Sequence, residues 1–189
     1  MTHIYFVRHA QKDLTNHDDA TRSLTEKGHR DAALVTAYLA DKTIDAVYSS
    51  PYCRAVDTIR PFAEKYGHTI RMDAEFRERE INVWFEDFLS FAEKQWQDFD
   101  YKTETGESLN MVSRRIAGAL DRILEAEAGR NVVIGGHGTA ICMAIRRYRP
   151  NFGFEDFMQM REKMPWIVHM AFDGKNCRKI EYVDLLIEG

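Results

Sequence analysis

The sequence predicts an α/β fold, a three-layer α/β/α sandwich around a mainly parallel sheet. Short runs of β-branched and aromatic residues, at 3–7 and 131–136, have the composition of buried strands. Segments with the apolar spacing of helices separate such runs, and strands that alternate with helices are typical of this class. At 189 residues the chain is long enough for one hydrophobic core, so we expect a single domain over residues 1–189.

The first elements are predicted from the strand at 3–7 onward. The polar residues 11–22 follow this strand and are typical of a loop. Ser23 and Glu26 then have the spacing of a capping box. Because apolar residues recur on one face beyond them, a helix is expected over residues 25–40.

A second strand and a second helix come next in the prediction. Residues 44–50 have the composition of a strand. Ser50 followed by Pro51 is typical of a helix start, and this helix carries Arg54 in its first turn. A short strand near 68–72 completes this half of the chain.

The second half begins with an aromatic-rich segment at 82–110, which we expect to form a lid-like insertion. The strongest amphipathic pattern follows at 106–129, where the apolar residues share one helical face and Gly129 ends the helix. Further elements are expected in chain order: a strand at 131–136, a helix from Thr139, a helix at 154–160, and a hairpin or two strands at 166–174 and 177–185.

Composition excludes several classes of partner. Acidic residues (30) exceed Lys and Arg (26), so the net charge of -4 does not favour nucleic acid or an anionic membrane. No run of apolar residues is long enough for a membrane span, and the N-terminal residues lack the pattern of a signal peptide. We therefore expect a cytoplasmic protein, with its oligomeric state, a homodimer included, left open.

Metal and cofactor chemistry have no motif in the sequence. The three cysteines are odd in number and form no C-x-x-C pair, which argues against a disulfide framework or a zinc site. No pair of the seven histidines has ligand spacing, and H-E-x-x-H, G-x-S-x-G and Walker A motifs are absent. Cys-x5-Arg, the signature of cysteine phosphatases, is absent as well. We expect neither a metal nor a cofactor.

Two histidines stand at the ends of predicted strands. His9 follows the strand at 3–7, and His137 follows the strand at 131–136. Ligands collect at the carboxyl ends of strands in an open α/β sheet, so the two imidazoles predict one shared site.

Two arginines point to phosphate as the ligand of this site. Arg8 and Arg54 each come directly after a predicted strand, and the planar guanidinium binds phosphoryl oxygens in bidentate fashion. The cation of Arg8 favours an uncharged His9, which is the form of histidine that can act as a nucleophile. His137 lies between glycines, where it is expected to stay protonated and hold phosphate oxygens.

These segments, in this order, resemble the histidine phosphatase superfamily, the phosphoglycerate mutase-like group with R-H-G after its first strand. The matching segments are VRHAQ, LTEKG, YSSPYCRAVDT, FRER, TGESL and GGHGTAI, which span nearly the whole chain. The resemblance implies a phosphoglycerate mutase-like fold with His9 as the phosphohistidine nucleophile and His137 as the second catalytic histidine. It further implies Glu78 as the acid, with these phosphate-binding residues: Arg8, Gln11, Arg54, His137 and Gly138.

Departures from the family pattern leave some positions open. Ala10 replaces the usual glycine, and Thr15 replaces an asparagine that often binds phosphate, with Asn16 as a register-shifted substitute. Glu78 has the expected spacing from Phe76 and Trp84. Glu80 remains the alternative acid, because alternate residues of an extended segment face the same side.

The resemblance implies a metal-independent phosphomonoester hydrolase for a small phosphorylated metabolite. A phosphoglycerate mutase is the first alternative, although such mutases typically have a longer segment between the acid and the second histidine. A noncatalytic domain that binds a phosphorylated ligand is the second. The aromatic residues of the lid-like segment would suit an apolar or aromatic ester, but packing is the favoured interpretation: Trp84, Phe85, Phe88, Phe91, Trp96, Phe99 and Tyr101.

Overall fold

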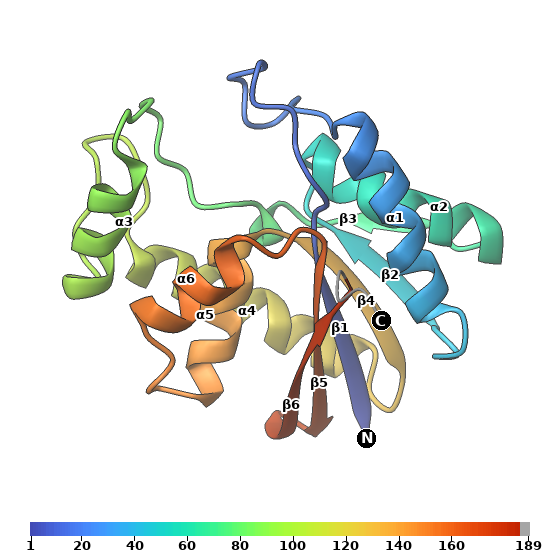
Figure 1. Ribbon diagram of the computed structural model, residues 1–189. Helices are drawn as coiled ribbons and strands as arrows, with labels where there is room; N and C mark the ends of the chain where they lie inside the picture. The colour runs from blue at the N-terminus through green and yellow to red at the C-terminus, as the bar shows by residue number, and fades with distance from the viewer. Residues whose placement is uncertain (186–189) are drawn as a thin grey trace.

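The six strands of the sheet follow the order β3 (Ile70–Met72), β2 (Ala46–Ser49), β4 (Asn131–Gly136), β1 (Thr2–Arg8), β5 (Trp166–Asp173) and β6 (Asn176–Asp184). They belong to a computed structural model of the chain, which describes residues 1–185 (Figure 1). The strands from β3 to β1 pair in parallel, whereas β5 is antiparallel to both β1 and β6. The sheet is therefore mainly parallel, as predicted, with a hairpin at one edge.

Helices cover both faces of this sheet (Figure 1). On one face lie α1 (Glu26–Leu39) and α2 (Cys53–Tyr66), and on the other lie α4 (Leu109–Ala126) and α5 (Gly138–Tyr148). Successive residues of β1 point to opposite faces. Tyr5 and Val7 join the core under α1 and α2, whereas Ile4 and Phe6 join the core under α4 and α5. The predicted three-layer sandwich is confirmed.

The aromatic-rich segment packs at one side of the molecule, beyond α4 and α6 (Phe154–Arg161) (Figure 1). Its helix, α3 (Phe88–Gln97), buries Phe91 and Trp96. The Trp96 ring lies 5.6 Å from the ring of Phe157 in α6. Trp84 differs, because it is 59% exposed and stacks on His17 at 4.1 Å. Packing thus explains the buried aromatics of this segment but not Trp84. Within residues 1–185, no helix is long and apolar enough to cross a membrane.

Two predicted helix caps are wrong by two residues, although α1 starts within one residue of its predicted position. The cap of α1 is Thr25, whose side chain accepts from the backbone N–H of Gly28, and not Ser23. The carbonyl of Ser23 accepts from Asp13 instead, so the chain is still extended at that residue. α2 begins at Cys53, after Ser50 and Pro51. The hydroxyl of Ser50 does not cap this helix, because it accepts from the backbone N–H of Tyr52 and forms a hydrogen bond with His137.

Gly28 marks a close crossing between α1 and the loop after β1. A Cβ atom at this position would lie 2.2 Å from the carbonyl oxygen of Gln11. The same oxygen accepts from the backbone N–H of Thr25 at 3.0 Å, so the contact holds the loop against the start of α1. The glycine of the LTEKG segment therefore fixes the path of the chain just beyond His9.

Replacing Gly28 with alanine is expected to lower the free energy of unfolding by about 1–3 kcal/mol, because the backbone must shift to admit the methyl group. Urea unfolding followed by circular dichroism measures this change. Gly118→Ala is the matched control, since its Cβ would meet only the end of Arg122, 3.9 Å away. Alanine in mid-helix stabilises by about 0.5–1 kcal/mol, so the two variants should move in opposite directions. Equal stability of Gly28→Ala and the unmodified protein would contradict this role.

Candidate active site

The two strand-end histidines meet at the centre of the sheet. β1 and β4 are parallel neighbours with Arg8 opposite Gly136, so His9 and His137 leave the sheet side by side. Both residues are buried, and their ring centroids are 5.4 Å apart. The two histidines that the sequence predicts to share one site therefore lie in one cluster.

The ring of His9 is held by a hydrogen bond that defines its tautomer. Its Nδ1 lies 2.7 Å from the carbonyl oxygen of Ala10. A carbonyl only accepts, so Nδ1 carries the proton and donates, and Nε2 is left with a free electron pair. The backbone N–H of Ala10 in turn donates to the hydroxyl of Thr58 on α2. The carbonyl group of Ala10 thus orients the imidazole, and Thr58 helps to hold Ala10 in place.

His9 is uncharged in this environment. Its pKa lies well below the ordinary value, first because burial disfavours the imidazolium and then because Arg54, Arg8 and Lys12 are cations nearby. The backbone oxygen of Ala10 opposes this shift only in part. The expected effect of Arg8 on His9 is therefore present, but burial and Arg54 are the larger causes.

His137 shares a hydrogen bond with Ser50, whose Oγ lies 2.8 Å from Nε2. Its Nδ1 is buried and has no hydrogen-bond partner among residues 1–185. Burial, followed by the charge of Arg54 and the ring of His9, lowers the pKa of His137 well below the ordinary value. These surroundings therefore favour the uncharged form of His137, whereas the sequence predicts a protonated one. The Tyr52 ring packs edge-on at 5.3 Å.

Arg54 is fully buried in the first turn of α2. Its Nη1 donates to the backbone oxygen of Asp19, and its Nη2 pairs with Asp19 Oδ1 at 3.1 Å. The same carboxylate oxygen pairs with Arg22 at 3.0 Å. Within residues 1–185 the Nε of Arg54 has no hydrogen-bond partner. Asp19 therefore binds one side of a guanidinium whose charge also acts on the two histidines.

The guanidinium of Arg8 binds the end of α6 through one nitrogen and lies next to Gly138 with another. Its Nη1 donates to the carbonyl oxygens of Met160, Arg161 and Lys163, each at 2.8 Å, and so anchors the end of α6. Its Nε faces Gly138, where a Cβ would lie 3.3 Å away, and is without a partner in the described part of the chain. Burial lowers the pKa of Arg8 to about 10. Only part of its guanidinium is therefore available to a ligand.

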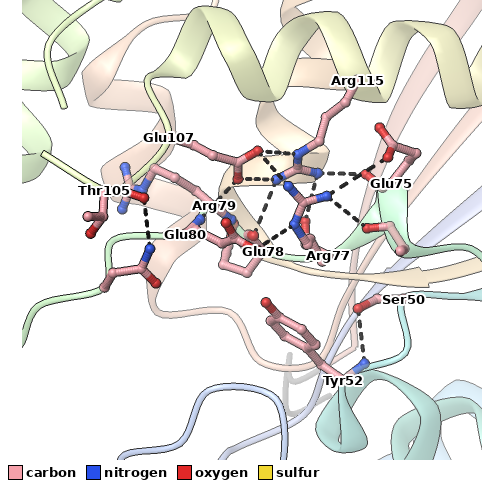
Figure 2. Close-up of polar contacts among 12 residues, drawn as sticks. Ser50, Tyr52, Glu75, Arg77, Glu78, Arg79, Glu80, Thr105, Glu107 and Arg115 are labelled. Carbon is pink, nitrogen blue, oxygen red and sulfur yellow. Dashed lines mark hydrogen bonds and ion pairs between the residues drawn. The ribbon is translucent and has the colours of Figure 1, made fainter. Parts of the chain in front are cut away.

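The carboxylate of Glu78 lies at the start of α5, the helix that follows His137. Its Oε2 accepts from the backbone N–H of Thr139 at 3.1 Å, and its Oε1 accepts from that of Arg79 at 2.8 Å. The carboxylate of Glu80 pairs instead with Arg77, 3.0 Å away (Figure 2). Of the two candidate acids, the one in contact with the helix that follows His137 is Glu78.

Three of the polar side chains considered as phosphate ligands lie outside the cluster. The exposed side chain of Gln11 accepts from the hydroxyl of Thr25 at 2.8 Å, toward the start of α1. Thr15 bonds to Asp13, and Asn16 bonds to Thr21. None of these side chains is directed toward His9, because the loop satisfies them with its own polar groups.

The cluster as a whole is suited to an anion. Arg8, Arg54 and His137 each present a buried nitrogen without a protein partner in the described residues. Buried polar groups are normally hydrogen-bonded, and guanidinium groups are the donors that match phosphoryl oxygens. No group of three or more metal-ligating side chains occurs in residues 1–185.

A family model for the histidine phosphatase superfamily (branch 1) matches residues 4–184 of the sequence. This chain belongs to the histidine phosphatase superfamily. The match covers almost the whole sequence, which confirms the resemblance seen in the ordered motifs.

Relatives within the superfamily differ in length. The chain is 31% identical over 160 residues to the bifunctional protein Rv2228c of Mycobacterium tuberculosis, covering 77% of this chain but 43% of that protein. The chain thus spans less than half the length of the first curated relatives it matches. It is 30% identical over 156 residues to a probable phosphoglycerate mutase, GpmB, of Yersinia pestis, covering 75% of this chain and 72% of the relative.

Solved structures share the superfamily fold. A mycobacterial glucosyl-3-phosphoglycerate phosphatase has a TM-score of 0.77 at 18% identity, covering 96% of this chain and 98% of its own. Phosphoserine phosphatase from Entamoeba histolytica in complex with 3-phosphoglyceric acid has a TM-score of 0.79 at 18% identity, covering 99% of this chain and all of its own. At this level of identity the likeness shows the fold alone.

Sequence reasoning missed one charge that acts on the two histidines. Lys12 is half-buried, and its ammonium makes no hydrogen bond or ion pair within residues 1–185. Its charge acts on both imidazoles, since it contributes to the lowered pKa values of His9 and His137. Lys12 follows His9 by only three residues, which is the one sequence signal for its effect on the histidines. A lysine in a polar loop is ordinarily solvated, so this signal is weak.

Proposed function

We propose that the chain is a metal-independent phosphomonoester hydrolase that acts through a phosphohistidine at His9. The observation that carries this proposal is the tautomer of His9: Nδ1 donates to Ala10, so Nε2 presents an unprotonated nitrogen in a cluster of cations. A neutral imidazole with one fixed nitrogen is the form that attacks phosphorus.

In the first half of the reaction, Nε2 of His9 attacks phosphorus and forms a P–N bond as the P–O bond to the leaving group breaks. Arg54 and the Nε of Arg8 bind nonbridging oxygens, and His137 adds a further donor. Glu78 transfers a proton to the departing oxygen, which leaves as the alcohol. In the second half, the Glu78 carboxylate takes a proton from water, the oxygen of which attacks phosphorus and releases His9.

Glu78 is the proposed acid because its carboxylate lies at the start of α5, next to the phosphate-binding side chains. The carboxylate of Glu80 is instead paired with Arg77 at 3.0 Å. A small phosphate ester is the proposed substrate class, and a solved structure of the same fold in complex with 3-phosphoglyceric acid supports it. The three cysteines are all free, which supports a reducing, cytoplasmic location.

Hydrolysis of p-nitrophenyl phosphate in the presence of EDTA tests the proposal. We expect turnover to persist. We also expect that reaction with a phosphate ester leaves an acid-labile phosphoryl group on the protein. An inactive protein that still binds inorganic phosphate would favour the noncatalytic alternative. A protein that neither hydrolyses esters nor binds phosphate would overturn the proposal.

Mutase activity is the second candidate, and the identity to a probable phosphoglycerate mutase of Yersinia pestis favours testing it. A mutase would interconvert 2- and 3-phosphoglycerate faster than it releases phosphate. We expect the reverse ratio, because the interval between Glu78 and His137 is shorter than is typical of such mutases. Nuclear magnetic resonance of phosphorus distinguishes the two products in one experiment.

Asp19→Asn is expected to strengthen inhibition by inorganic phosphate roughly five-fold, which corresponds to about 1 kcal/mol. The carboxylate of Asp19 pairs with Arg54 and would repel an anion bound to the same guanidinium. Asparagine keeps the shape but removes the charge. Asp31→Asn, which removes a surface partner of Lys27, is the control. Weaker phosphate inhibition in Asp19→Asn would mean that the carboxylate mainly orients Arg54.

The pH dependence of kcat/KM should carry an alkaline limb that belongs to Lys12. Burial, together with the cations of Arg54 and Arg22, lowers the pKa of Lys12 from 10.5 to about 8, while Glu78 and Asp19 oppose the shift. As pH rises above this value the ammonium loses its proton and the site loses a positive charge, so kcat/KM should fall by up to about ten-fold per pH unit.

Two substitutions assign that limb. Lys12→Arg should abolish the decline below pH 10, because guanidinium stays protonated, whereas Lys12→Met should lower kcat/KM and remove the limb. Lys27→Met on the surface of α1 is the control. An unchanged alkaline limb in Lys12→Met would assign it to another group.

A further inference from the structure

The segment that carries Glu78 is held by a buried ion pair between Arg115 of α4 and Glu107, which directly precedes the cap of this helix (Figure 2). Arg115 and Glu107 form two parallel hydrogen bonds, from Nε to Oε1 at 2.8 Å and from Nη2 to Oε2 at 2.9 Å. Their side chains are 8% and 7% exposed. This bidentate geometry fixes both groups relative to each other.

The Arg115–Glu107 pair binds the backbone of residues 75–80, the acid segment. Arg115 Nη1 donates to the carbonyl oxygens of Glu75 at 2.6 Å and Arg77 at 3.0 Å. Its Nη2 donates to the carbonyl oxygen of Glu78 at 3.2 Å. From the other partner, Oε2 of Glu107 accepts from the backbone N–H of Glu80 at 3.0 Å. The peptide groups before and after the acid are therefore bound by one pair.

This segment has few hydrogen bonds of its own. Residues 77–81 lie outside any helix or strand, between the short 3₁₀ helix η1 (Ala74–Phe76) and the loop before α3. A carboxylate on such a segment has no fixed position unless the rest of the fold supplies it. Arg115 and Glu107 provide this support, and the carboxylate of Glu78 then meets the backbone N–H of Thr139 at 3.1 Å.

We propose that Glu107 and Arg115 are positioning residues, which place the Glu78 carboxylate for proton transfer to the leaving group. This inference rests on the proposed function. Glu107 must stay ionised to hold both partners, and its surroundings keep it so. Burial alone would raise its pKa, but hydrogen bonds from Arg115 and the Glu80 N–H, with the charges of Arg115 and Arg77, hold the pKa below its ordinary value.

The role predicts a dependence on the leaving group that a loss of stability does not produce. An alkyl phosphate needs a proton on its departing oxygen, whereas p-nitrophenolate leaves without one. A displaced Glu78 should therefore impair hydrolysis of the alkyl ester selectively. Because kcat/KM reports only steps up to the first P–O cleavage, the later hydrolysis of phosphohistidine does not enter the comparison.

The experiment measures kcat/KM of the full chain for glycerol phosphate and for p-nitrophenyl phosphate. Glu107→Gln is expected to lower the first by about 10- to 100-fold and the second by less than about three-fold, a pattern shared with Glu78→Gln. Arg115→Lys should be intermediate, since lysine keeps the charge but not the fork. Arg114→Met and Glu104→Gln, on exposed neighbouring positions, are the matched controls.

The ratio of the two values is independent of the folded fraction, because both substrates report on the same sample. If single variants fail to fold, Glu107→Gln combined with Arg115→Gln removes both charges and avoids an unpaired one. Equal losses for the two substrates in Glu107→Gln, with a selective loss in Glu78→Gln, would overturn this inference alone. Absence of a selective loss in Glu78→Gln would overturn the acid assignment and the inference together. An unmodified protein without activity toward either ester would instead overturn the proposed function.

Discussion

His9→Ala is expected to lower kcat for p-nitrophenyl phosphate by about 10³-fold or more, because no other group can form the covalent intermediate. His9 is the histidine whose Nδ1 is held by a backbone carbonyl, which leaves Nε2 unprotonated near the cations Arg54, Arg8 and Lys12. The acid-labile phosphoryl group should disappear with the activity. Steady-state kinetics and trapping of labelled phosphoenzyme measure the two losses in parallel.

Phosphate binding separates a chemical defect from a structural one in this variant. Arg8 and Arg54 remain in His9→Ala, so inorganic phosphate should bind within a few-fold of its normal affinity. His29→Ala, at an exposed position of α1, is the control and should keep full turnover. Undiminished activity of His9→Ala would exclude the phosphohistidine mechanism.

The fold is largely predictable because its signals are local. The interiors of β1 and β4 are mostly apolar, and each strand is followed directly by a histidine. Because the two strands are parallel neighbours, His9 and His137 come together. The pattern of α4 is similarly complete, with Ser108 as its cap and one apolar face. Periodicity of this kind depends only on nearby residues.

The errors occur where contacts are distant in sequence. Ser23 and Ser50 both have the residue type of a helix cap, but Ser23 remains in extended chain and Ser50 hydrogen-bonds His137, 87 positions away. Gln11 follows the nucleophile closely, yet its side chain turns to Thr25. Residue type favours a cap at each serine, and the family pattern favours a phosphate ligand at Gln11. Contacts with residues distant in sequence determine where these side chains lie instead.

The choice between Glu78 and Glu80 also depends on distant residues. Both are expected to face the same side of an extended segment. In the structure, Glu78 accepts from the backbone N–H of Thr139, 61 positions away, whereas Glu80 pairs with Arg77, which Glu107 also binds. The motif around Glu107 is visible in the sequence as TGESL, but its contact with the acid segment spans 27 residues. The motif therefore predicts a helix start and does not reveal the carboxylate that organises the site.

Arg54→Met is expected to lower kcat/KM by about 10²–10³-fold, because a buried donor to the transferring phosphoryl group is lost. A second effect distinguishes Arg54 from a purely structural residue. Its charge is the largest electrostatic cause of the lowered pKa of both His9 and His137. Without it the pKa of His9 rises, the protonated and inactive form persists to higher pH, and the acid limb of the pH profile moves upward.

Two further variants test whether charge or geometry at position 54 produces these effects. Arg54→Lys retains the cation, so the acid limb should stay near its original pH while kcat/KM remains reduced, since an ammonium cannot replace the planar fork. Arg60→Met, at a half-exposed position of the same helix, should change neither quantity. If Arg54→Met reduced activity without moving the acid limb, Arg54 would bind phosphate without tuning His9. Burial would then be the main cause of the lowered pKa of His9 and would keep its imidazole uncharged.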